Sequence, residues 1–136
     1  MGDQQDSRVE NLRAIPLFSG MSDESLQRIL DSASEVDLSP GHVLIQPGMP
    51  GSGLFVIEEG EVTVELPGRQ AELGPGEFVG DLALLTDHPH TGRVRAKTPV
   101  KALAINREDF GSLLNAEPKM ALSMLEALAQ RLAGAP

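Results

Sequence analysis

The stretch from about Glu35 to Asn106 has a different apolar period from the rest of the chain, and this change limits the fold most. Short apolar runs, separated by proline and glycine, occur at Val43–Ile45, Leu54–Ile57 and Val62–Leu66. Two more runs follow in VRAKTPVKALAIN, and the tetrapeptides EEGE and PGRQ are typical of hairpin turns. Several short strands at this spacing indicate a sandwich or barrel. The pattern therefore predicts an antiparallel β-roll, or jelly roll, over about residues 35–106.

A helical period flanks this stretch on both sides. Before it, an apolar stripe extends to about residue 33, and Ser22 can cap the second of two helices. After it, Asn106 can cap another helix and Pro118 can begin the last one. The prediction is a single, mainly β domain over residues 1–136, with helices over about 8–33, the roll over about 35–106 and helices over about 107–132.

Composition excludes several classes of function. The chain has 136 residues and no cysteine, which excludes disulfide scaffolds, cysteine nucleophiles and cysteine-ligated metals. The formal net charge of −9 and the lack of tryptophan and tyrosine argue against nucleic-acid binding by this chain. The first residues do not resemble a signal peptide, and no apolar run approaches transmembrane length. We therefore expect a cytoplasmic protein that does not contact membranes.

The segment GEFVGDLALLTDHPHTGRVRAKT, residues 76–98, places a glycine turn, a second glycine and a carboxylate before a short apolar run and a strand. It resembles the phosphate-binding cassette of the cyclic nucleotide-binding domain family, the sensor modules of catabolite-activator-type transcription factors, protein kinase regulatory subunits and some ion channels. IPLFSGMSDESLQRIL, GHVLIQPGMPGSGLFVIEEGEVTVEL and LAINREDFGSLLNAEP resemble the family's opening helices, first strands, and last strand with its helix. The resemblance implies a regulatory domain of signal transduction that binds cAMP or cGMP.

The resemblance also implies where the ligand would bind. Gly80 stands at the cassette glycine, which lets backbone N–H groups face a phosphate. Asp81 stands where the family usually has the glutamate that accepts a hydrogen bond from the ribose hydroxyl. His90 stands at the phosphate-binding arginine, and Thr91 at a residue that often also meets the phosphate. The implied ligand-binding residues are Val79, Gly80, Asp81, Leu82, Ala83, His90 and Thr91.

His90 departs from the family in a way that affects binding. Arginine is always charged and can bind two phosphate oxygens, whereas an ordinary histidine is mostly neutral at about pH 7. Side chains alternate along a strand, so Val94 and Ala96 would share the interior face with His90. The opposite face would then carry Arg93 and Arg95, so neither is predicted to replace the missing arginine. We therefore expect weak or absent cyclic nucleotide binding at about pH 7.5.

Other functions stay open on the residues alone. The ligand could be another small anion, or the chain could be a ligand-free protein-interaction or dimerisation domain of the same fold. A homodimer would form through helix 118–132, whose residues Met120, Met124, Leu125, Leu128 and Leu132 have heptad-like spacing. No residues remain after this helix for a helix-turn-helix domain, so we expect a stand-alone sensor or a part of a larger regulator.

A metal protein of the cupin type is a further alternative. It would use Asp87, His88 and His90 as ligands, but Val94 and Arg95 stand where cupins have a glutamate. No serine–histidine pair or carboxylate pair stands out as catalytic. We therefore expect no enzyme, no cofactor and no bound metal.

Overall fold

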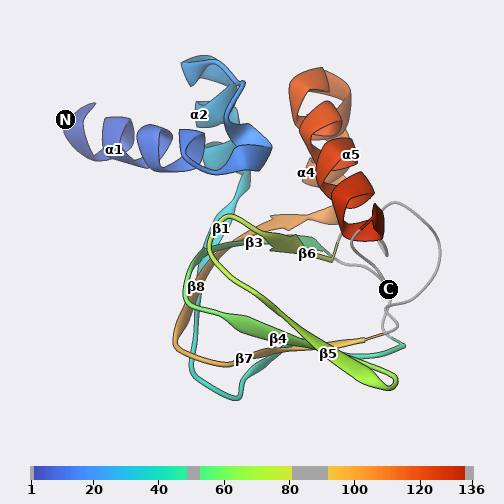
Figure 1. Cartoon of the computed structure of the whole chain (residues 1–136). Coiled ribbons are helices and arrows are strands. Elements are labelled where there is room, and N and C mark those ends of the chain that lie inside the picture. Colours follow the sequence, from blue (N-terminus) through green and yellow to red (C-terminus); the bar gives the residue numbers. More distant parts are fainter. Residues whose placement is uncertain (1, 49–52, 81–91, 134–136) are drawn as a thin grey trace. The chain divides into compact units, whose positions relative to one another are not determined.

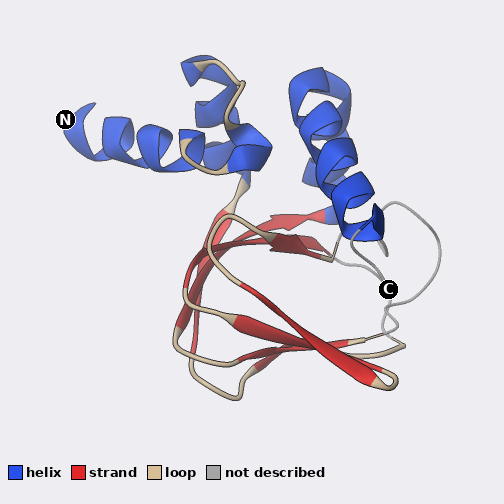
Figure 2. Ribbon diagram, viewed as in Figure 1, coloured by secondary structure: helices blue, strands red, loops and turns tan. Residues whose placement is uncertain are grey.

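The computed structural model describes residues 2–48, 53–80 and 92–133, and it divides the chain into two compact units. One unit contains residues 33–110 and the other contains residues 1–32 together with 111–136. The first unit holds the strands and the second holds most of the helices (Figures 1 and 2). The prediction that residues 1–136 form one domain stays a prediction.

The β unit is a roll of two four-stranded antiparallel sheets. Sheet A has the strand order β1-β8-β3-β6 and sheet B the order β2-β7-β4-β5 (Figure 1). The strands are β1 Ser34–Leu38, β2 Val43–Ile45, β3 Gly53–Glu59, β4 Val62–Leu66, β5 Arg69–Leu73, β6 Phe78–Val79, β7 Arg93–Ala96 and β8 Val100–Asn106. The predicted antiparallel roll is confirmed.

The core of the roll lies between its two sheets. Sheet A contributes Ile57, Val79, Val100 and Ala102, and sheet B contributes Ile45, Val62, Val94 and Ala96. These side chains occupy alternate positions of strands such as β7, whose burial alternates residue by residue. Burying apolar area is the main favourable term in folding, so this alternation selects which face of each strand turns inward.

The helical unit contains α1 Gly2–Arg13, the short 3-10 helix η1 Pro16–Phe18, α2 Asp23–Ser32, most of α4 Arg107–Ala116, and α5 Pro118–Ala133. Both predicted caps are confirmed. Ser22 Oγ accepts a hydrogen bond from the N–H of Ser25 at 3.2 Å, and Asn106 Oδ1 accepts one from the N–H of Asp109 at 2.8 Å. Within the described part of the chain, no helix is long and apolar enough to cross a membrane.

Two elements differ from the sequence-based expectation. Helix α1 begins at Gly2, whereas a start at about residue 8 was expected from the apolar positions. Strand β5 was not named in advance, although PGRQ was expected to form a hairpin turn, because most of its side chains are exposed and polar and no apolar alternation marks it. Its register on β4 is regular from Leu66–Arg69 to Val62–Leu73, so backbone pairing across the PGRQ turn defines it.

Candidate functional site

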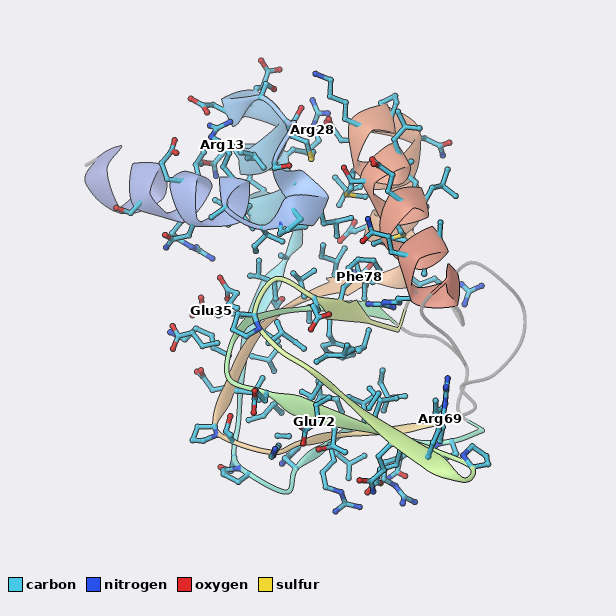
Figure 3. The ribbon with its side chains drawn as sticks, in the orientation of Figure 1. Arg13, Arg28, Glu35, Arg69, Glu72 and Phe78 are labelled. Carbon is cyan, nitrogen blue, oxygen red and sulfur yellow. The ribbon has the colours of Figure 1, made fainter. Side chains whose placement is uncertain are left out.

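The candidate site is the segment between β6 and β7, and the structure describes how its first end is held. Strand β6 pairs with β3, with Val79 opposite Phe55. Before β6, the N–H of Ile57 donates to the carbonyl of Glu77 at 2.8 Å, and the N–H of Gly76 donates to the carbonyl of Ile57 at 2.7 Å. These bonds fix the approach to the site on sheet A, where Figure 3 labels Phe78.

Gly80 follows β6 and cannot be replaced by a larger residue without strain. Its φ is +96°, a backbone conformation that side chains disfavour. A Cβ atom there would lie 2.4 Å from the carbonyl oxygen of Gly53. The chain therefore leaves sheet A through a turn that needs glycine for two reasons. Both reasons are structural, so the expectation that Gly80 lets the backbone approach a ligand closely stays a prediction.

Gly53 was missed by sequence reasoning, although it forms the surface on which Gly80 rests. It is the first residue of β3, and a Cβ atom there would lie 2.8 Å from the carbonyl oxygen of Ile105 on β8. Three backbones, those of Gly80, Gly53 and Ile105, thus approach one another closely. A glycine in a strand is the sequence signal of such a close approach.

The second end of the site is held on sheet B. A Cβ atom at Gly92 would lie 2.9 Å from the carbonyl oxygen of Glu65 and 2.8 Å from Cδ2 of Leu66, both on β4. Strand β7 then pairs with β4 on one side and β2 on the other. The segment between Gly80 and Gly92 therefore joins one sheet of the roll to the other, and close backbone contacts fix both of its ends.

The two faces of β7 are as predicted. Val94 and Ala96 are buried in the core, whereas Arg93 and Arg95 are half-buried on the other face. Arg93 donates a hydrogen bond from Nε to Oε1 of Gln46 at 3.3 Å, and its Nη1 lies 3.6 Å from Oε1 of Glu65. Arg95 Nη2 also lies 3.6 Å from this oxygen. Arg93 points away from the roll interior and is already paired.

The structure describes two of the seven predicted site residues. The side chain of Val79 is buried in the roll core, so it could meet a ligand only through its backbone. Gly80 makes the turn out of sheet A. The other predicted residues, Asp81, Leu82, Ala83, His90 and Thr91, lie outside the described residues, as do the proposed metal ligands Asp87 and His88. The structure therefore describes the two ends of the candidate segment, and the roles of these side chains stay predictions.

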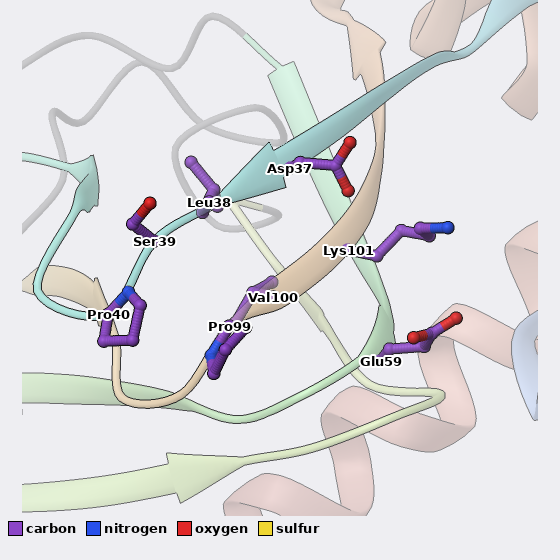
Figure 4. Close-up of a pocket in the computed structure, with 8 residues that line it drawn as sticks. All are labelled: Asp37, Leu38, Ser39, Pro40, Glu59, Pro99, Val100 and Lys101. Carbon is purple, nitrogen blue, oxygen red and sulfur yellow. The ribbon is translucent and has the colours of Figure 1, made fainter.

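A pocket of about 290 Å³ lies elsewhere on the roll (Figure 4). Lys101 of β8 is paired in register with Asp37 of β1 and Glu59 of β3, so two carboxylates flank one ammonium group. The pocket therefore lies at the Glu59 end of β3. Gly80 lies near the other end of β3, where Gly53 pairs with Asn106. The pocket is also lined by Leu38, Ser39, Pro40, Pro99 and Val100. Its excess of carboxylates does not suit a phosphate.

Positive side chains on the outer face of sheet B are paired with carboxylates, and Lys97, which follows β7, is one example. Its Nζ lies 2.6 Å from Oε2 of Glu72, and this hydrogen bond, with the charge of Glu72, raises the pKa of Lys97 above its ordinary value. Glu72 and Arg69 are labelled on β5 in Figure 3. Together with the pairing of Arg93 and Arg95 by Glu65, this leaves no obvious basic patch on the described part of this face.

Comparison with known proteins identifies the family. The sequence matches the family described as cyclic nucleotide-binding domain over residues 35–117, which is more than half of the chain. The chain belongs to the cyclic nucleotide-binding domain family. It is also 32% identical to a cyclic nucleotide-gated potassium channel of Rhizobium etli over 90% of this chain and 35% of the channel.

Solved structures agree with this assignment. The N-terminal domain of a transcriptional regulator from Streptomyces coelicolor A3(2) is 38% identical, with a TM-score of 0.68, over 90% of this chain and 92% of that one. The regulatory subunit of a cAMP-independent protein kinase A from Trypanosoma brucei is 28% identical, with a TM-score of 0.79, over 94% of this chain and 48% of that one. A triple mutant of that subunit has been solved with cAMP bound in its A site.

The chain spans only part of the curated proteins that it matches. It covers 35% of the Rhizobium etli channel and 41% of the acetyltransferase Pat of Mycolicibacterium smegmatis, to which it is 30% identical. Channels and an acetyltransferase thus contain a region similar to this chain beside other sequence. What the chain shares with them is one region of their length.

Proposed function

We propose that this chain is a regulatory sensor domain whose cyclic nucleotide site is preserved in its frame but weakened at the phosphate. The observation that carries the proposal is the placement of Arg93, which is paired with Gln46 and Glu65 on the face away from the roll interior. With Arg93 turned away, His90 is the basic residue left at the position where the family has arginine. Gly80 has a positive φ and turns the chain out of sheet A, which is compatible with the proposed phosphate site.

The exchange of arginine for histidine should weaken binding without abolishing the site. A hydrogen bond to a charged group contributes roughly 1.5–3 kcal/mol. Losing one prong of a two-pronged contact should therefore lower affinity by about tenfold to a few hundredfold. Asp81 adds to the loss, because its carboxylate is one methylene shorter than the glutamate of the family.

A relative offers an analogy that supports the proposal. The Trypanosoma brucei subunit is described as part of a cAMP-independent kinase, and its cAMP-bound mutant carries three substitutions, one of which replaces threonine with arginine. By analogy, the domain fold persists in a protein that does not respond to cAMP. We extend this to the present chain, and we propose a non-enzymatic and cytoplasmic role for it.

Titration of the purified chain with cAMP and cGMP by calorimetry tests the proposal. The wild type should bind weakly or not at all near pH 8 and more strongly near pH 6, because a bound phosphate favours the protonated imidazole. The variant His90→Arg should bind about tenfold or more tightly at both values of pH, since its charge is permanent.

The matched control is Arg93→Ala, which removes a cation three positions after His90 in the sequence. It should leave cAMP affinity unchanged within about twofold, because its side chain points away from the roll interior. Tight binding by the wild type near pH 8 that Arg93→Ala abolishes would contradict the proposed site. A lack of binding by His90→Arg at both values of pH would favour a domain without a nucleotide ligand.

The second candidate is a ligand-free interaction or dimerisation domain, and one observation favours it. Leu122 and Leu125 on α5 are 60% and 62% exposed, which is unusual for large apolar side chains that lie close together on one helix. Such a pair suits contact with a second copy of the chain. Self-association by itself would also be compatible with nucleotide sensing, because the two would use different elements.

A further inference from the structure

Glu117 has an unusual position for a carboxylate. It lies between α4 and α5, and its side chain is only 9% exposed. Its N–H donates to the carbonyl of Leu113 at 2.7 Å, and its own carbonyl accepts the N–H groups of Met120 and Ala121 at 3.0 and 3.3 Å. The residue is therefore built into the end of α4 and the first turn of α5.

The partner of this carboxylate comes from a distant part of the sequence. Arg28 on α2, labelled in Figure 3, donates from Nη1 to Oε2 of Glu117 at 2.6 Å across 89 positions. The Arg28 side chain is 48% exposed, so the ion pair lies at the edge of the helical unit. The Arg28 side chain can therefore leave its partner for solvent, whereas the Glu117 side chain is almost fully buried.

We propose that the Arg28–Glu117 pair is a latch that holds the α4–α5 junction against α2, so that opening the pair releases α5. The reason lies in the cost of a buried charge. When Arg28 leaves, Glu117 keeps a buried carboxylate without its cation, which is strongly unfavourable. The relief is movement of the junction toward solvent. Because the carbonyl of Glu117 accepts the first hydrogen bonds of α5, this movement is passed directly to that helix.

The other anchor of α5 is apolar and differs in kind. Met120 and Met124 are buried, and α5 lies against η1. Methionine side chains are flexible and fit many packing arrangements. The apolar contact therefore holds α5 in place without defining one orientation, while the ion pair defines the orientation of its first turn. The latch sets the position of the helix that carries the exposed Leu122 and Leu125.

Hydrogen–deuterium exchange of the full chain, read by mass spectrometry, tests the latch without any ligand. In Arg28→Gln, peptides from α5 should exchange about three- to tenfold faster than in the wild type, the range expected for loss of a half-exposed charge-assisted bond. Peptides from sheets A and B should exchange as before. Arg28→Lys keeps a cation and should restore most of the protection in α5.

Lys119→Gln is the matched control, since it removes one positive charge from the exposed surface of the first turn of α5. It should leave exchange in α5 unchanged. Unchanged exchange of α5 in Arg28→Gln would overturn the latch. So would a rise of equal size in α5 and in the sheets, because that result would show a general loss of stability. Neither outcome depends on whether the chain binds a nucleotide.

Discussion

A side chain would be unfavourable at Gly80 and at Gly68, but for different reasons. Both have positive φ, +96° at Gly80 and +78° at Gly68. At Gly68 in the β4–β5 turn a Cβ atom would meet nothing within 4 Å, whereas at Gly80 it would lie 2.4 Å from the carbonyl oxygen of Gly53. Backbone conformation alone therefore explains glycine at Gly68, and close packing of two backbones adds to it at Gly80.

The variant Gly80→Ala should lower the free energy of unfolding by about 2 kcal/mol or more, because conformational strain and a backbone clash add together. Gly68→Ala should cost only about 1 kcal/mol, since only the strain applies. Urea denaturation followed by circular dichroism measures both. Equal losses in the two variants would show that the contact with Gly53 does not constrain the turn at the candidate site.

At the scale of elements, α5 has two kinds of apolar side chain. Met120 and Met124 are buried, and Leu122 and Leu125 are mostly exposed. The helix is 16 residues long, which is too short for an independent coiled coil. The exposed pair could stabilise a dimer only together with other contacts, so the expected self-association is weak and depends on protein concentration.

The double variant Leu122→Gln with Leu125→Gln should shift the chain from dimer to monomer in light scattering at high protein concentration. Its unfolding midpoint at low concentration should stay close to that of the wild type, since substitutions at exposed positions usually change stability by less than about 0.5 kcal/mol. Glu126→Gln, an exposed change on the same helix, is the control. A wild type that is monomeric at every concentration would argue against the dimer.

At the scale of the whole molecule, the formal net charge of −9 sets the behaviour toward polyanions. Cations on the described face of sheet B are already matched by Glu61, Glu65 and Glu72. Binding to DNA rests on clustered lysine and arginine that displace counterions from phosphates. The charge of this chain opposes such contact.

The chain should therefore not shift duplex DNA in a gel assay at physiological salt and micromolar protein. The physical reason is long-range repulsion, so lowering the salt should not create a shift. A DNA-binding protein of known affinity, run beside it, controls for the assay. A shift that weakens as salt is raised would contradict the prediction. It would indicate a local basic surface despite the negative net charge of the chain.

Local pattern was sufficient for most of the architecture. The alternation at Val94–Ala96 predicted which side chains enter the roll, because burial selects one face of each strand. On β4, Val62 is buried in the core and Val64 packs partly against it. Ser22 and Asn106 predicted two helix starts, since their oxygens accept backbone N–H groups three residues ahead. The outward placement of Arg93 followed from the same alternation. These features depend on neighbours a few residues apart, which a sequence displays directly.

Contacts between distant segments were decided only by the tertiary structure. The pairing of Arg28 with Glu117 joins residues 89 positions apart, and no local pattern marks either as a partner. The approach of Gly80 to the Gly53 carbonyl depends on how β6 lies on β3. In each case the deciding energy is a short-range contact that forms only once the chain has folded.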